Sequence, residues 1–277
     1  MSTFEKYDKT SRHYDKTRVP VGAEIILDCL GRHEKPLREL TVLDAGCGTG
    51  AYSRAIIGHV GRIEAVDLSN GMLEVARAKL AIESQDGRIR FHNAPITDLP
   101  FEAETIDGVM INQVTHHLGD TAEDGFTILR RAVAEFARVL RPGGVLVFNT
   151  CSREQIDHGY WYYALIPEAR ESFQARFAPL EDLRAMFEGA GFVNRGSFAP
   201  LDAVCQGEAY FDGRGPLEVT WRNGDSIWAL AGEAELARAL DKVRALDAAG
   251  ELGAFVAEHD ARRAEAGQIT FLFATRA

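Results

Sequence analysis

Two acidic residues and a glycine-rich turn are the groups in this sequence best suited to bind a small ligand. Asp44 lies in the apolar run VLDA, which glycines at 46, 48 and 50 follow in the order GCGTG. Such glycines let the backbone approach a ligand closely. Asp67 ends the next apolar run, and a carboxylate there can accept hydrogen bonds from both hydroxyls of a ribose. The pattern predicts a nucleoside site at the carboxyl ends of two neighbouring strands.

The charge of this turn selects among nucleotide ligands. A phosphate-binding loop needs a Lys directly after its glycines, and here no Lys or Arg follows before Arg54. The spacing is GxGxG rather than the GxGxxG of a dinucleotide turn, and a carboxylate beside a diphosphate costs about 1 kcal/mol at about 4 Å even in water. S-adenosylmethionine has a ribose diol, a sulfonium and an ammonium group but no phosphate, so it fits two acids better than a nicotinamide dinucleotide does.

A parallel sheet is expected to position these residues. Short β-rich runs alternate with helical patterns, which is typical of a doubly wound α/β fold. The expected strands cover 41–45, 63–68, 89–94, 106–113, 144–151, 192–199 and 268–277. Leu129, Val133, Phe136 and Leu140 form one helical stripe, which we expect to end at 142–144. Ser69 is expected to cap the next helix after the second strand.

The chain divides into three parts by the same pattern. Residues 1–40 are expected to form an N-terminal helical cap, and 41–200 with 268–277 the nucleoside-binding domain. Residues 201–267 interrupt the alternation of strands and helices and are expected to form an insertion. This insertion is either a wall of the acceptor site or a stabilising surface subdomain.

Composition limits the class of protein. The chain has 277 residues, 46% hydrophobic residues and a formal net charge of −10, which disfavours nucleic acid as a partner. No apolar run approaches the length of a membrane span, and the polar start lacks the apolar core of a secretory signal. Four dispersed cysteines indicate neither a metal site nor a disulfide framework. We therefore expect a cytoplasmic protein without metal; the oligomeric state stays open.

Five motifs in order resemble the class I S-adenosylmethionine-dependent methyltransferases, most closely the type 11 group that includes ubiquinone and menaquinone biosynthesis enzymes. The motifs are VLDAGCGTG at 42–50, EAVDLSNGML at 64–73, LPF at 99–101, IDGVMINQVTHHL at 106–118 and ARVLRPGGVLVF at 137–148. The resemblance implies a Rossmann-like, mostly parallel seven-stranded sheet with an antiparallel last strand. It implies transfer of a methyl group to a small molecule, through O, N, S or C, with S-adenosylhomocysteine as product.

The resemblance also implies roles for residues of the cofactor site. The backbone at Gly46–Gly48 faces the methionine moiety, Asp67 binds the ribose, Asn93 and Ala94 flank the adenine, and Asn112 and Gln113 lie near the methionine end. The N-terminal segment folds over the cofactor in relatives, which adds Tyr14 and Arg18. The expected cofactor-binding residues are Tyr14, Arg18, Asp44, Gly46, Cys47, Gly48, Asp67, Leu68, Met72, Asn93, Ala94, Asn112 and Gln113.

One position departs from the family pattern. Many relatives have an Asp before LPF that accepts a hydrogen bond from the adenine amino group, and here Pro95 stands at that place. Asn93 or Asp98 could substitute for it. Cys47 is expected to be a small turn residue rather than a nucleophile, because no basic group adjoins it in the sequence.

The acceptor side is less specified. Alignment can supply roughly 7–11 kcal/mol of a displacement barrier, so a thiol or amine acceptor needs no base, whereas a hydroxyl would benefit from one. His117 is the candidate base; in the alternative, His116 and His117 only pack under the cofactor or cap a helix. Four adjacent aromatics, 160–163, should not all fit one core, so Trp161 and Tyr162 are candidate substrate-binding residues together with Arg222. Arg222 and Asp225 could instead pair with each other.

Two other functions remain compatible with the sequence. One is an enzyme that uses S-adenosylmethionine for a reaction other than methyl transfer. The other is a regulatory protein that binds S-adenosylmethionine without catalysis.

Overall fold

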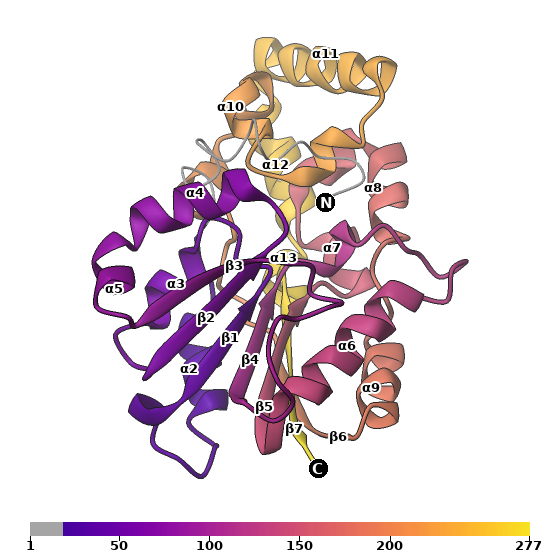
Figure 1. Ribbon diagram of the computed structural model, residues 1–277. Coiled ribbons are helices and arrows are strands. Elements are labelled where there is room, and N and C mark those ends of the chain that lie inside the picture. The colour runs from indigo at the N-terminus through magenta and orange to yellow at the C-terminus, as the bar shows by residue number, and fades with distance from the viewer. Residues whose placement is uncertain (1–18) are drawn as a thin grey trace.

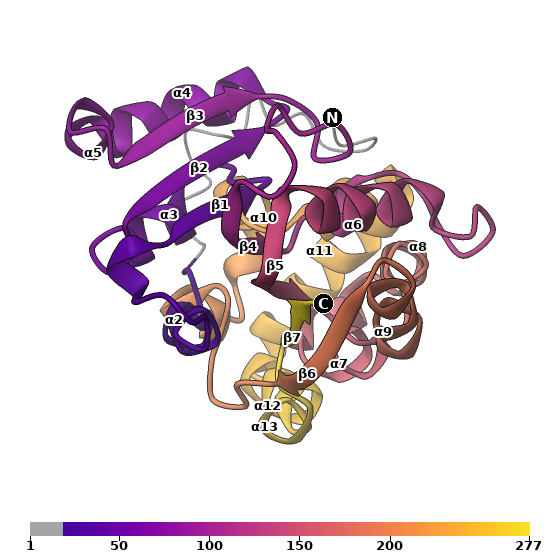
Figure 2. The same cartoon turned by 60° about the horizontal axis from the view of Figure 1, so that its bottom comes forward.

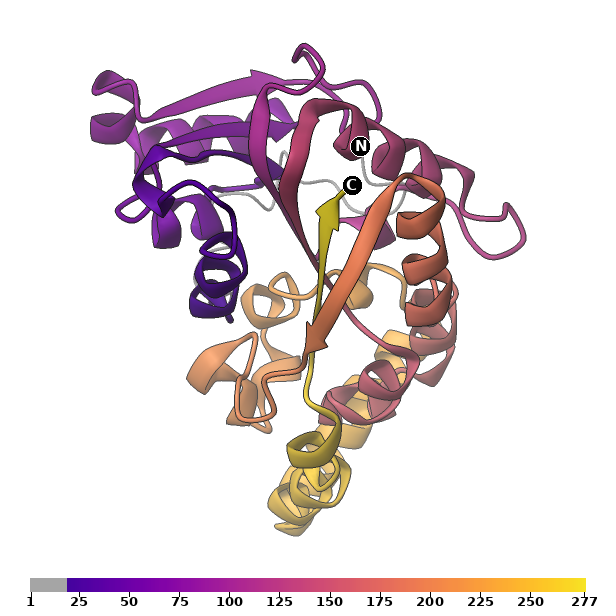
Figure 3. The same ribbon diagram turned by 90° about the horizontal axis from the view of Figure 1, so that it is seen from below.

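The strands form one seven-stranded sheet with the order β3-β2-β1-β4-β5-β7-β6. The computed structural model describes residues 19–277. The strands are β1 Thr41–Ala45, β2 Arg62–Asp67, β3 Ile89–Asn93, β4 Ile106–Asn112, β5 Leu140–Thr150, β6 Phe192–Phe198 and β7 Thr270–Arg276. Strands β1 to β5 pair in parallel, whereas β7 lies antiparallel between β5 and β6, where Figure 3 shows it in yellow. The predicted fold class is confirmed.

Alternate residues of the buried strands enter two different cores. On β1, Val42 belongs to one apolar cluster, whereas Leu43 and Ala45 belong to the other. Helices α2 Ala23–Leu30, α3 Ala51–Ile56 and α4 Asn70–Lys79 contribute to the first cluster, and α6 Thr127–Val139 and α9 Leu180–Gly189 to the second. Figure 2 shows α2 and α3 on one side of the sheet and α6 and α9 on the other. Continuous apolar strands are the expected result of cover on both faces.

The junction between α6 and β5 differs from the sequence prediction. Leu129, Val133 and Phe136 lie buried along α6, but the helix ends at Val139, and Leu140 is already extended. Leu140 pairs with Ile106 of β4, so the segment at 142–144 lies inside β5 rather than ending a helix. Strand pairing, which the local sequence does not encode, moved this boundary. The cap on α4 is confirmed: Ser69 Oγ accepts a hydrogen bond from the Met72 N–H at 3.3 Å.

Apart from α9 and β6, the chain between β5 and β7 covers the carboxyl ends of the parallel strands, at the top of Figure 1. The predicted insertion at 201–267 lies between the end of β6 and the start of β7. Its helices are η4 Gly207–Phe211, η5 Gly215–Leu217, α10 Val219–Arg222, η6 Ser226–Ala229, α11 Glu233–Ala249, α12 Leu252–Asp260 and α13 Arg263–Ala266. It packs against a second group of helices, α7 Arg153–His158, η3 Trp161–Leu165 and α8 Pro167–Gln174. The remaining short helices are η1 Leu37–Glu39, α5 Ala81–Gln85 and η2 Thr115–His117.

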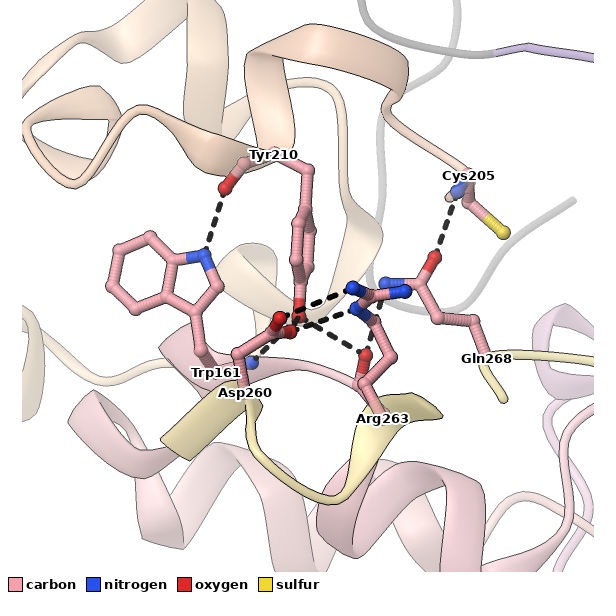
Figure 4. Close-up of polar contacts among 7 residues, drawn as sticks. Trp161, Cys205, Tyr210, Asp260, Arg263 and Gln268 are labelled. Carbon is pink, nitrogen blue, oxygen red and sulfur yellow. Dashed lines mark hydrogen bonds and ion pairs between the residues drawn. The ribbon is translucent and has the colours of Figure 1, made fainter. Parts of the chain in front are cut away.

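Hydrogen bonds around Tyr210 hold the helices of this cover to one another, as drawn in Figure 4. Its hydroxyl donates to Asp260 Oδ1 at 2.5 Å and accepts from the Trp161 backbone N–H at 3.2 Å. Its backbone carbonyl accepts from the Trp161 indole N–H at 2.8 Å. Arg263 pairs with both Asp260 oxygens, at 2.8 and 3.1 Å. One side chain thus ties η3, η4 and the end of α12 together.

Hydrogen bonds of the Gln268 side chain hold the cover to the sheet. This residue is fully buried just before β7, and its Oε1 accepts from the Cys205 N–H at 2.7 Å. Its Nε2 donates to the Gly159 carbonyl at 2.9 Å. The start of the insertion and the end of α7 are therefore held to the strand that closes the sheet.

No helix of residues 19–277 is both long and apolar enough to cross a bilayer.

Replacing Tyr210 with Phe tests the hydrogen bonds of the Tyr210 hydroxyl. The change removes a hydroxyl that bonds the half-buried Asp260 and leaves the buried Trp161 N–H without this partner, so we expect the free energy of unfolding to fall by about 1–3 kcal/mol. Urea denaturation measures it. The exposed Val219→Ala variant is the control and should stay within about 0.5 kcal/mol of the original chain. Equal stability of the two variants would contradict the role of Tyr210.

Candidate cofactor and acceptor site

The turn after β1 has the backbone shape that its glycines predict. Gly46 and Gly48 have φ angles of 76° and 53°, which favour glycine. A Cβ on Gly46 would lie 2.5 Å from Val114 Cγ2, whereas one on Gly48 would meet no atom within 4 Å. The N–H groups of Gly46 and Cys47 both donate to the Val66 carbonyl, at 2.8 and 2.9 Å. The turn is therefore anchored to β2 on one side and open at Gly48 on the other.

Asp67 connects this turn to the next one. Its Oδ2 accepts from the Gly48 N–H and its Oδ1 from the Ser69 N–H, each at 2.8 Å. Burial raises the pKa of Asp67, and these two hydrogen bonds oppose that rise. A carboxylate oxygen can accept more than one hydrogen bond. Both oxygens thus keep the capacity to accept from a ribose diol, which fits the predicted role of Asp67. The adjoining Leu68 is 41% exposed, and Met72 is buried at the start of α4.

Asp44 lies beneath the same turn. Its side chain is 1% exposed and accepts a hydrogen bond of 2.6 Å from Ser53 Oγ. Burial raises the pKa of Asp44 to about 7, and the negative charge of Asp67 adds to the rise. Two neighbouring carboxylates in a low-dielectric site favour a cationic ligand over an anionic one. This electrostatic setting suits a sulfonium and an ammonium group.

A network of amides follows the ends of β4 and β5. Gln113 has a φ of 55°, rare for a residue other than glycine, and its Nε2 donates to Asn149 Oδ1 at 2.8 Å. Asn149 Nδ2 donates to Tyr52 Oη at 3.3 Å and to Asn112 Oδ1 at 3.4 Å. Asn112 Nδ2 is buried and has no hydrogen-bond partner among residues 19–277. An orphaned buried donor beside the glycine turn fits a ligand carboxylate or hydroxyl there.

Sequence reasoning missed two members of this network, Tyr52 and Asn149. Asn149 is the register partner of Asn112 across β4 and β5, so knowledge of the strand order would have found it. Tyr52 donates to the Val21 carbonyl at 3.0 Å, a contact between segments far apart in the chain, and no local pattern predicts it.

On the expected adenine side, Asn93 shapes the turn that carries Asp67. Its Nδ2 donates to the carbonyls of Asp67 and Leu68, at 3.1 and 2.9 Å, and the Ala94 N–H also donates to the Asp67 carbonyl, at 3.3 Å. Pro95 and Asp98 are exposed. The structure brings Asn93 and Ala94 beside Asp67 as predicted; which residue binds the adenine amino group stays a prediction.

The two histidines after β4 have different surroundings. His116 is buried and stacks on Phe177 with ring centroids 4.9 Å apart. Its Nε2 lies 3.4 Å from Ser226 Oγ of the insertion. His117 is half-buried, and its ring centroid lies 3.9 Å from that of His116. His116 therefore joins the sheet to its cover, and a role for His117 as base stays a prediction.

All four aromatics of 160–163 are buried in one apolar cluster, contrary to the expectation that they should not all fit one core. The reason is that the insertion and α8 surround this short 3₁₀ segment and supply a core on more than one side. Trp161 is fully buried, with its indole N–H bound to the Tyr210 carbonyl. Tyr162 is also fully buried, and its hydroxyl donates to Asp225 Oδ2 at 2.5 Å. Direct contact of Trp161 or Tyr162 with substrate remains a prediction.

Arg222 and Asp225 do not form an ion pair with each other in the described part of the chain. Arg222 donates to the Pro216 carbonyl at 2.5 Å, and burial lowers its pKa. Asp225 is 3% exposed and accepts from Tyr162, Tyr163 and Gln206. The alternative of a simple Arg222–Asp225 pair is thus wrong, and Asp225 instead organises the aromatic cluster.

Three other predictions concern single residues or ions. Burial raises the pKa of the Cys47 thiol well above its ordinary value, which disfavours a thiolate and agrees with a turn residue. Tyr14 and Arg18 lie outside the described residues. Within 19–277, no three His, Cys, Asp or Glu side chains gather as metal ligands would.

Comparison with known proteins agrees with this geometry. Residues 43–148 match the family described as "Methyltransferase domain". The chain is 34% identical over 163 residues to a demethylmenaquinone methyltransferase of Clavibacter sepedonicus, covering 57% of this chain and 62% of that protein. It is 29% identical over 175 residues to an O-methyltransferase of Penicillium expansum, covering 61% of this chain and 59% of that protein. The matches thus span about three fifths of these curated relatives.

Solved structures with the same fold extend over nearly the whole chain. A protein of Anabaena variabilis, described as a methyltransferase from an antibiotic biosynthesis pathway, superposes with a TM-score of 0.70 at 21% identity, covering 93% of this chain and 98% of that one. Geranyl diphosphate C-methyltransferase of Streptomyces coelicolor, in complex with S-adenosylhomocysteine, has a TM-score of 0.55 at 17% identity, covering 92% and 78%. The fold is that of a Rossmann-like methyltransferase. The family match over residues 43–148 and these relatives support the predicted class I, type 11 methyltransferase domain with S-adenosylmethionine as its cofactor.

Removal of the Asp67 carboxylate should weaken cofactor binding. Asp67→Ala deletes charge-assisted hydrogen bonds to the ribose, so we expect a loss of about 1.5–3 kcal/mol in the affinity for S-adenosylhomocysteine. Calorimetric titration measures it. Asp86→Ala is the matched control, because it removes the same charge from an exposed turn before β3. An unchanged dissociation constant in Asp67→Ala would contradict the ribose role.

Replacing Asp44 with Asn should change how stability depends on pH. The pKa of Asp44 is about 7 in the fold against an ordinary value of 3.8, so the folded state retains a proton that the unfolded chain loses. Stability of the original chain therefore falls as pH rises from about 4 to about 7 and is constant above, an effect of at most about 4 kcal/mol. Asp44→Asn lacks this loss.

We thus expect the stability of Asp44→Asn, relative to the original chain, to be greater at pH 8 than at pH 4. Chemical denaturation of both proteins at the two pH values measures the difference. A difference between the two proteins that does not depend on pH would show that Asp44 titrates normally.

Proposed function

We propose that this protein transfers the methyl group of S-adenosylmethionine to a small-molecule acceptor. The observation that carries the proposal is the position of Asp67, which bridges the two turns beside the open glycine. The matching methyltransferase family and the relatives, one named for demethylmenaquinone and one for O-methylation, support it.

In this proposal the cofactor supplies an electrophilic methyl group on a sulfonium and leaves as S-adenosylhomocysteine. The residues of the chain bind and orient. Asp67 holds the ribose, the open backbone at Gly48 admits the methionine moiety, and the Asn112 amide donates to it. Asp44 and Asp67 together favour positive charge near the sulfur. The acceptor loses one proton, which solvent or His117 accepts according to the acidity of the acceptor.

The cover formed by 151–178 and the insertion at 201–267 closes the acceptor side. Water is then excluded from the displacement, and alignment contributes most of the rate enhancement. Buried cysteines without disulfides, at positions 29, 47, 151 and 205, support the further proposal of a reducing, cytoplasmic location.

The test is turnover of isotopically labelled cofactor. The protein is incubated with methyl-labelled S-adenosylmethionine and a panel of phenols, thiols and amines, and mass spectrometry follows labelled product and S-adenosylhomocysteine. We expect labelled product, and we expect Asp67→Ala to need more cofactor for half-maximal rate than the Asp86→Ala control. Binding of S-adenosylhomocysteine without turnover of any acceptor would favour the sensor. Association with NAD alone would overturn the cofactor assignment.

A further inference from the structure

Among the buried polar atoms of the insertion at 201–267, two lack a hydrogen-bond partner within residues 19–277: Gln206 Oε1 and Trp228 Nε1. Both side chains are nearly inaccessible, with 5% and 6% of their surface exposed. A buried polar atom without a partner costs about 1–3 kcal/mol, so folded proteins rarely keep one without a reason. The first atom is an acceptor and the second is a donor.

The three tryptophans of the chain show that Trp228 is a special case. The indole N–H of Trp161 donates to the Tyr210 carbonyl at 2.8 Å, and that of Trp221 donates to the Ala209 carbonyl at 2.7 Å. All three rings lie in the same apolar cluster. Two of the three indole N–H groups in this cluster therefore have backbone carbonyl partners, and only that of Trp228 has none among residues 19–277.

The orientation of the Gln206 amide leaves its oxygen available. Its Nε2 donates to the Tyr162 hydroxyl and to Asp225 Oδ2, the latter at 3.2 Å. An amide turned the other way would place its oxygen against the Asp225 carboxylate, which is unfavourable. Tyr162 also stacks with Trp228, with ring centroids 6.0 Å apart and planes at 15°. The two unpartnered atoms thus belong to side chains that flank one tyrosine.

A side-chain contact links the helix of Trp228 to the segment that follows β4. Trp228 belongs to η6, which begins at Ser226, and Ser226 Oγ lies 3.4 Å from His116 Nε2 in η2. Helix η2 begins three residues after Asn112, whose unpartnered amide ends β4 on the expected cofactor side. Unpartnered atoms therefore stand on both the cofactor side and the cover side of this contact.

We propose that Gln206 Oε1 and Trp228 Nε1 bind a hydroxyl group of the methyl acceptor, which is therefore a hydroxyl-bearing ring compound. A hydroxyl donates one hydrogen bond and accepts another, so it satisfies both atoms at once. An ammonium group cannot accept from the indole, and a carboxylate cannot donate to the amide. The apolar cluster that contains Trp228 also contains the rings of Tyr162, Tyr163 and Phe177, which suit a flat apolar ring. The inference rests on the proposed function for calling this ligand the acceptor.

The experiment measures binding rather than turnover, with the protein saturated with S-adenosylhomocysteine. The probes are naphthol, its methyl ether and naphthoate, and calorimetry gives each dissociation constant. We expect naphthol to bind about tenfold or more tightly than the other two, because the ether cannot donate to Gln206 and the carboxylate meets Asp225.

Trp228→Phe removes the indole donor and part of the buried ring, so it should weaken naphthol binding about tenfold, lower the melting temperature through lost packing, and leave S-adenosylhomocysteine affinity unchanged. Trp221→Phe is the matched control: it breaks a bond that the free protein makes, so it should lower the melting temperature and leave naphthol affinity unchanged. Equal affinity for naphthol and its ether, absence of naphthol binding, or an unaffected Trp228→Phe variant would each overturn the inference. Failure of all turnover with this binding pattern intact would instead refute only the proposed function.

Discussion

The carboxylate of Asp67 is the constraint on which the site depends. Its two oxygens take N–H groups from two different turns, one at Gly48 after β1 and one at Ser69 after β2. Burial disfavours the charged form, and the two hydrogen bonds offset part of that cost. Because one small group fixes both turns, the two turns are set relative to each other before any ligand arrives; in the proposed function they hold the methionine end and the ribose.

Ionisation of Asp44 has a cost that either a proton or a nearby cation relieves. The carboxylate is buried, accepts a hydrogen bond from the Ser53 hydroxyl and lies near the negative charge of Asp67. Its ionised form is therefore disfavoured near neutral pH. A bound sulfonium or ammonium would stabilise that ionised form by the same Coulomb interaction that now opposes it. The free protein is thus less stable than it would be with an uncharged side chain at position 44. In the proposed function, binding of a cationic nucleoside offsets this cost. Stability and binding are coupled here through one proton.

The sequence was informative where one short segment determines the outcome. The sheet, the glycine turn and Asp67 follow from local apolar runs and from residue types that few other structures require. Contacts between distant segments were not predictable: Leu140 joins β5 because it pairs with Ile106, and Asn149 enters the site because it is the neighbour of Asn112. The full burial of Trp161 and Tyr162 was not predicted for the same reason, since the side chains that cover them come from the insertion.

The insertion is therefore part of the core, and in the proposed function it is also a wall of the acceptor site. Its aromatic rings continue the apolar cluster of one sheet face, so substitutions there change stability as well as specificity. Polar atoms inside such a cluster separate into two kinds. Those of Tyr210 and Gln268 are satisfied within the chain and hold the cover in place. Those of Gln206 and Trp228 are not, and the low dielectric around them makes a matching ligand group worth more than it would be at an exposed surface. Selectivity can then change by altering the unsatisfied atoms alone, while the satisfied ones keep the fold.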